Sequence, residues 1–200
     1  AMLADGVLFS FHYTFPKYAT TGTIVFIDNI QLLAEKTSAG DSELILEQDF
    51  NDCEVGSTLP DGWTRKNKNS SDTWKISKLG DTLAASCSAD TDSEGDYWSG
   101  DEYGAGQDEF LISPALNLAG KTATMTFEFS GQKNSLSKTV VSNKTPATLE
   151  ASLDGGKTWT EIWNAADGSD QLVSGVHSSY VASADFTVEI PEDFLQDGVQ

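Results

Sequence analysis

The stretch "VLFSFHYTF", residues 7–15, alternates large apolar side chains with polar ones. The apolar positions are Phe9, Phe11, Tyr13 and Phe15, and the polar positions between them are Ser10, His12 and Thr14. Successive side chains of an extended chain point to opposite faces, so this alternation predicts a strand with one face in a core and one face toward water.

The rest of the chain repeats this pattern in short segments separated by Gly, Asp, Asn and Ser. In "TATMTFEFSG", residues 122–131, the alternation predicts that Ala123, Met125, Phe127 and Phe129 point inward. Helical periodicity is almost absent. We therefore expect an all-β chain that folds as an antiparallel β-sandwich of jelly-roll type.

The segment "SLDGGKTW", residues 152–159, has the spacing of the Asp-box turn, which is best known from sialidase propellers. A propeller would repeat the motif at blade length, and a sialidase grips its substrate carboxylate with several arginines. This chain has one box and one arginine, Arg65. The motif is therefore interpreted as a hairpin turn, in which Asp154 accepts hydrogen bonds from the following backbone N–H groups.

The charge balance limits the possible partners. The 200 residues include 31 acidic and 12 basic ones, and the formal net charge is −19. A nucleic acid or an anionic lipid surface would be repelled, so we expect no nucleic-acid partner. No apolar run is long enough to span a bilayer, and no transmembrane segment is expected. Carboxylates are also the ligands that calcium prefers.

Six segments occur in an order that resembles one family of bacterial surface modules. They are "LEQDFND" (46–52), "LPDGWT" (59–64), "SDTWKIS" (71–77), "DEFLISPALNL" (108–118), "TMTFEFSG" (124–131) and "ASLDGGKTWTEI" (151–162). Together they resemble the cleaved-adhesin or choice-of-anchor J family. The resemblance implies a jelly-roll module of a secreted or cell-surface bacterial protein, non-catalytic and often holding a structural calcium ion.

The order of the segments departs from that family at the N-terminus. The family's sandwich usually ends with an aromatic strand and then a strand bearing Asp-Asn, whereas here these features lie in residues 7–33. The segment "LADGV" at residues 3–7 also reappears as "LQDGV" at residues 195–199. We therefore predict that residues 1–36 supply two terminal strands to a module over residues 44–200, across a linker at 37–43. They would complete the sandwich within one chain or by strand exchange with a second copy.

Two sets of acidic residues are candidate calcium sites. Asp28, Asp49 and Asp52 could converge on one cation if the first and last strands of the fold lie side by side; alternatively, Asp28 and Asp49 hydrogen-bond turn backbones. Asp90, Asp92, Glu94 and Asp101 match positions 1, 3, 5 and 12 of a calcium-loop spacing, but their flanks are not helical and the loop could simply be solvated.

The same acidic loop carries three aromatic residues, Tyr97, Trp98 and Tyr103. Sugars stack on exposed rings beside acidic or amide groups, so these residues are candidate glycan contacts; the alternative is that Trp98 caps the core. Trp63, Trp74 and Trp159 fit strand or turn patterns and are expected in the core. Cys53 and Cys87 could form a disulfide or remain buried thiols.

No catalytic constellation is evident, because neither His12 nor His177 has an obvious nucleophile partner. The sequence thus predicts a non-enzymatic, secreted or surface module that binds a glycan or a host surface protein, with a possible structural calcium. The alternatives are a structural spacer domain and, more remotely, an accessory domain of a glycoside hydrolase.

Overall fold

The computed structural model of the chain describes residues 6–15, 24–36, 41–67, 73–88, 107–132, 147–177 and 181–195. Its strands are β1 (Leu8–Phe15), β2 (Ile24–Lys36), β3 (Ser42–Gln48), β4 (Thr64–Asn67), β5 (Lys75–Leu79), β6 (Thr82–Ser88), β7 (Gln107–Ile112), β8 (Lys121–Gln132), β9 (Ala147–Ser152), β10 (Thr160–Asn164), β11 (Val173–Ser174) and β12 (Val181–Glu189). Within these ranges the helical elements are two short 3₁₀ turns, η1 (Ser169–Gln171) and η2 (Glu192–Phe194).

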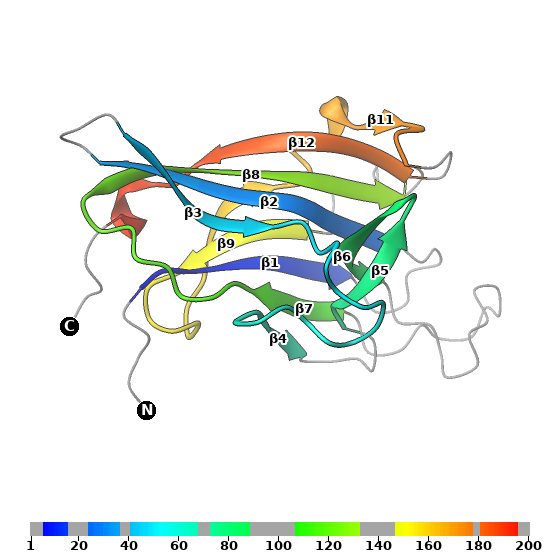
Figure 1. Ribbon diagram of the computed structural model, residues 1–200, viewed down its shortest axis with the longest axis horizontal. Coiled ribbons are helices and arrows are strands. Elements are labelled where there is room, and N and C mark those ends of the chain that lie inside the picture. Colours follow the sequence, from blue (N-terminus) through cyan, green and yellow to red (C-terminus); the bar gives the residue numbers. More distant parts are fainter. Residues whose placement is uncertain are drawn as a thin grey trace.

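The strands form two antiparallel sheets that pack face to face (Figure 1). One sheet has five strands in the order β10-β9-β1-β7-β4. The other has seven, in the order β11-β12-β8-β2-β6-β5, with β3 also paired to β2. The chain passes repeatedly from one sheet to the other, and the predicted antiparallel β-sandwich is confirmed.

β1 lies in the middle of the five-stranded sheet, between β9 and β7. Phe9, Phe11 and Tyr13 are at most 2% exposed, which confirms the inward face predicted from their alternation. Phe11 is in register with Leu111 of β7 and Leu149 of β9, both fully buried. Burying an aromatic side chain of this size contributes roughly 1.5–3 kcal/mol, so β1 is a main source of core stability.

β2 has the same central place in the seven-stranded sheet. One edge pairs with β8 and the other pairs first with β6 and then with β3. The register shifts between Asp28 and Gln31, where Asn29 has a φ of 50°. This bulge changes which residues point inward: Ile27 is buried before it and Ile30 after it. Asp28, which follows the inward Ile27 and precedes the bulge, lies on the outer face, the face turned away from the core.

The core fills the space between the sheets. Phe11 of β1 meets Phe127 of β8 edge to face, with ring centroids 5.0 Å apart. Trp163 of β10 contacts Phe127 and Phe129 in the same way. The residues of β8 predicted to point inward are all buried, and Trp63 and Trp74 belong to the core as expected.

Three smaller sequence predictions can be compared with the structure. β3 begins at Ser42, inside the predicted linker at residues 37–43, and pairs with β2. Cys53 and Cys87 are thiols and are not joined by a disulfide. In the described part of the chain, no helix is long and apolar enough to cross a membrane.

Deletion of residues 1–36 should abolish the folded state, because it removes the central strand of each sheet and leaves two pairs of edges without partners. Circular dichroism, thermal unfolding and size-exclusion chromatography of the deleted chain check this. The expected result is an aggregated or unfolded protein. A soluble, monomeric and equally stable remainder would show that these strands are dispensable.

Candidate functional site

The Asp-box turn joins β9 to β10 and is held by its own side chains. The Asp154 carboxylate accepts hydrogen bonds from the backbone N–H groups of Lys157 and Thr158, each at 2.9 Å, and from the Thr158 hydroxyl at 2.7 Å. These bonds to Thr158 are the main reason that the pKa of Asp154 lies well below its usual range. Gly156 has a φ of 79°, which suits the reversal. The predicted structural role of Asp154 is thus confirmed.

A pocket of about 450 Å³ lies where β3 ends. The residues that line it are Glu47, Gln48, Asp49, Asp52, Cys53 and Pro60. Two of the three residues of the first predicted calcium site, Asp49 and Asp52, therefore share one pocket. Burial and then the charges of Asp52 and Asp49 raise the pKa of the Cys53 thiol, which disfavours its nucleophilic thiolate form.

The third predicted ligand, Asp28, is 1% exposed and lies on the outer face of β2. Its carboxylate accepts hydrogen bonds from the Asn29 backbone N–H at 2.8 Å and the Thr82 hydroxyl at 3.2 Å. Burial is the main reason that the pKa of Asp28 is raised from 3.8 to about 6; the charges of Glu128 and Asp49 add to this effect, and the hydrogen bonds from Asn29 and Thr82 oppose it. The contribution of Asp49, the smallest of these, indicates that Asp28 and Asp49 interact electrostatically.

Backbone strain accompanies these two acids. Among the described residues, the non-glycine residues with positive φ are Asn29, at 50°, and Phe50, at 58°. They directly follow Asp28 and Asp49. A phenylalanine in this conformation is rare and costs on the order of 1–3 kcal/mol, which the burial of the Phe50 ring beside Trp63 offsets.

The described residues do not include a group of three or more His, Cys, Asp or Glu side chains arranged to hold a metal ion. Asp28, Asp49 and Asp52 therefore do not form a ready coordination shell. The second predicted calcium set (Asp90, Asp92, Glu94 and Asp101) and the predicted glycan contacts (Tyr97, Trp98 and Tyr103) lie outside the described residues.

A row of three carboxylates crosses the outer face of the seven-stranded sheet. Glu128 of β8 is in register with Asp28 of β2 on one side and with Asp185 of β12 on the other. Like charges in such cross-strand positions are destabilising. His177, which follows β11, offsets this by a short hydrogen bond from its ring to the Glu128 carboxylate.

The outer face of the five-stranded sheet carries the other histidine. The Nδ1 atom of His12 lies 2.8 Å from the Glu150 carboxylate of β9, and its Nε2 atom lies 2.8 Å from the Asp108 carboxylate of β7. The His12 ring is thus held between carboxylates from the two neighbouring strands. The ring stacks on Phe110, with centroids 3.8 Å apart and planes inclined by 14°.

Other side chains complete what we call the His12 face, defined by His12, Lys66, Asp108, Phe110, Glu150 and Trp159. The ring of Trp159 lies 5.9 Å from that of Phe110, and the Lys66 ammonium lies 5.8 Å from the Phe110 centroid. Trp159 is half-buried, whereas Phe110 is buried. Trp159 was expected in the core; it lies instead on the outer face, where the Asp-box turn holds it.

Sequence reasoning missed the His12 face as a site. It placed His12 on the polar side of its strand, which is correct, but its partners are 96 and 138 residues away. One sequence pattern could have indicated this site. Asp108 and Phe110 occupy alternate positions of "DEFLI", so a strand there places a carboxylate and an aromatic ring on one face.

Comparisons of the chain with protein-family models, with curated proteins and with solved structures find no match.

The raised pKa of Asp28 predicts a specific pH dependence of stability. The folded state holds this proton up to about pH 6 and the unfolded chain only to about pH 4, so the free energy of unfolding falls as pH rises between these values. The stability of the parent protein relative to that of Asp28→Asn should therefore drop by roughly 1–3 kcal/mol from pH 4 to pH 7.

Denaturant unfolding of both proteins at several pH values measures this difference. Thr82→Ala is the control, because it removes a donor to Asp28 and keeps the carboxylate; it should retain the decline. If the difference in the free energy of unfolding between the parent and Asp28→Asn does not change with pH, the account is contradicted.

Proposed function

We propose that the chain is a non-catalytic, adhesin-like module of a secreted or cell-surface bacterial protein, and that its His12 face binds a glycan. The observation that carries the proposal is the combination of stacked rings and fixed carboxylates on one sheet face. Sugar rings pack their C–H faces on aromatic side chains and donate hydroxyl hydrogen bonds to carboxylates.

The His12 face is organised before any ligand arrives. His12 is held between two carboxylates and rests on Phe110, so Asp108 and Glu150 are fixed in position. The Asp108 side chain remains 27% exposed, so part of it faces solvent. Preorganised acceptors lose little conformational entropy on binding and so favour affinity.

The charge of the chain favours a neutral glycan over an acidic one. With a net charge of −19 and carboxylates at the site, an acidic sugar would be repelled. Arg65, the one arginine of the sequence, donates a hydrogen bond from Nη1 to the backbone oxygen of Trp74 at 2.6 Å. Arg65 is therefore committed to the fold.

A glycan array of neutral and acidic oligosaccharides tests the proposal, followed by affinity measurements with the bound neutral glycan. Trp159→Ala should weaken binding by roughly tenfold or more because it removes a stacking ring. Lys66→Ala, an exposed change on the same face, should weaken it less. Lys78→Ala, exposed on the other sheet, is the matched control and should bind like the parent.

Equal binding by all three variants would place the glycan elsewhere, with Trp98 as the next residue to change. Binding of a host protein without binding of any glycan would favour a protein ligand. Absence of binding to both would favour the structural spacer.

We also propose a structural calcium ion near Asp28, Asp49 and Asp52. The support is the shared pocket of Asp49 and Asp52 and the electrostatic interaction of Asp49 with Asp28. Binding would require movement of these side chains, since they do not form a coordination shell among the described residues.

If calcium binds the folded state, it should raise the melting temperature of chelator-treated protein, and Asp49→Asn should reduce the shift. Thermal unfolding at increasing calcium concentrations measures both effects, with magnesium as the comparison cation. Identical melting curves with and without millimolar calcium would contradict a calcium site.

A further inference from the structure

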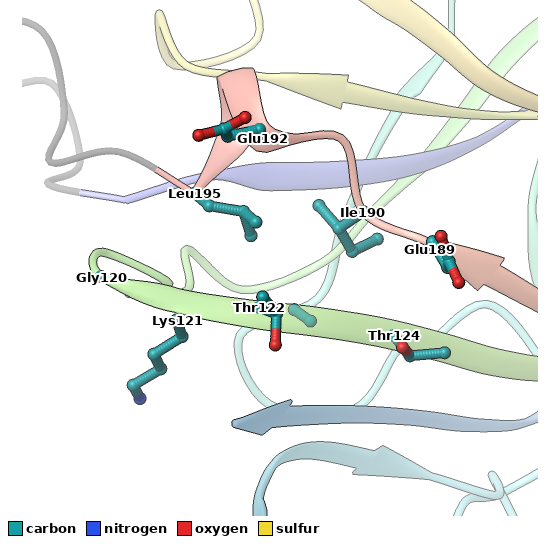
Figure 2. A pocket seen from close by; sticks show the side chains of 9 residues that line it. Gly120, Lys121, Thr122, Thr124, Glu189, Ile190, Glu192 and Leu195 are labelled. Carbon is teal, nitrogen blue, oxygen red and sulfur yellow. The ribbon is translucent and has the colours of Figure 1, made fainter. Parts of the chain in front are cut away.

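Two buried polar side-chain atoms on the outer face of the five-stranded sheet have no hydrogen-bond partner in the described part of the chain. They are the Oγ atom of Ser10 and the Nε1 atom of Trp159. By contrast, the cleft of about 550 Å³ between the start of β8 and the chain after β12 does not bring polar groups together: Figure 2 shows Glu189 and Glu192 apart, with Ile190 between them. Most buried polar groups of a protein are hydrogen-bonded, so an unpartnered pair on one face needs an explanation.

Ser10 is fully buried although its side chain points away from the core. It alternates with the inward-pointing aromatic residues of β1 and so shares the outer face with His12. Its neighbours in register are Ile112 of β7 and Glu150 of β9. The exposed fraction of Ser10 is nevertheless 0%. A serine on the outer face of a sheet is buried to this extent only if another group covers it.

The ring of Trp159 crosses the sheet at this place. At one end, the position where a Cβ atom would stand on Gly156 lies 3.0 Å from the Trp159 ring and 3.8 Å from the Leu8 side chain. At the other end, the centroid of the Trp159 ring lies 5.9 Å from that of Phe110. Leu8 stands two residues before Ser10 on β1, and Phe110 is in register with the residue two positions after it. The ring therefore lies over Ser10.

The closed position of this cover leaves hydrogen bonds unmade. Trp159 is half-buried, and its Nε1 atom belongs to the covered part of the ring. The Trp74 indole, by comparison, is fully buried and donates to the Glu109 backbone oxygen at 3.0 Å. A buried polar group without a partner has given up its bonds to water and gained none in return. Rotation of the Trp159 ring away from the sheet would let both it and Ser10 form hydrogen bonds.

We propose that Trp159 is a movable cover and that Ser10 binds a hydroxyl group of the glycan beneath it. This inference rests on the glycan site proposed above and adds a contact that the closed ring hides. A sugar hydroxyl both donates and accepts, as the Ser10 hydroxyl does. The opened Trp159 ring would stack on the sugar, and its N–H would be free to donate.

Exchange of the indole N–H groups tests the cover before any glycan is added. NMR spectra of the full ¹⁵N-labelled chain in D₂O follow each indole, and the signal lost in Trp159→Phe identifies Trp159. Its N–H should exchange faster than that of Trp74 by roughly a hundredfold or more, because the Trp74 indole is exposed only when the core opens. Equal exchange of the two indoles would overturn the movable cover.

Titration with cellotriose, xylotriose, galactotriose and mannotriose tests the role of Ser10. A trisaccharide that binds the His12 face should shift the indole signal of Trp159. Ser10→Ala should weaken its binding by roughly two- to tenfold, the effect of one lost neutral hydrogen bond. The same variant should melt at the parent's temperature or above it, because it removes a buried hydroxyl that has no partner.

Ser183→Ala is the matched control on the other sheet. Ser183 is also buried, but its Oγ atom lies 2.6 Å from that of Ser130. This variant should melt at a lower temperature than the parent and bind the trisaccharide equally well, which is the opposite pattern.

The outcomes separate this inference from the proposed glycan site. If a trisaccharide binds and Ser10→Ala binds it as tightly as the parent does, the contact with Ser10 is overturned and the glycan site stands. If neither the trisaccharides nor the glycans of the array bind the parent, the glycan site and the contact with Ser10 are both overturned.

Discussion

The structure depends on the placement of one strand, β1, in the middle of one sheet and the following strand, β2, in the middle of the other. Each has partners on both edges, and Phe11 of β1 touches Phe127 on the neighbour of β2. The segment before residue 37 therefore pairs with strands of both sheets, and it contributes buried side chains to the core from each sheet. The His12 face and the position of Asp28 follow from it, because these residues occupy the outward positions of the same two strands.

A second constraint is the large excess of acidic residues, which the described part of the chain accommodates in several ways. His12 contacts two carboxylates, and His177 contacts the central member of a row of three. Asp154 is stabilised by N–H groups of its own turn, whereas burial favours the protonated form of Asp28.

The local pattern of the sequence predicted the fold class and the inward faces of β1 and β8, because period-two alternation is a property of neighbouring residues. The Asp-box turn was predictable for the same reason. The His12 face was not, since its contacts depend on the register of strands distant in sequence. Nor could the pattern reveal the bulge at Asn29, where one residue with positive φ reverses the alternation of β2 and turns Ile30 inward. Asp49 and Asp52 line one pocket because they are close neighbours in the chain.

The central claim is that β1 and β2 are integral to a single cooperative core. Native-state hydrogen exchange measures this directly, since it reports the free energy of the opening that exposes each amide. The account predicts that the hydrogen-bonded amides of β1 and β2 exchange through global unfolding, with the same free energy as those at the centre of β8. Exchange of the β1 and β2 amides through a separate opening of lower free energy, while β8 stays protected, would contradict it.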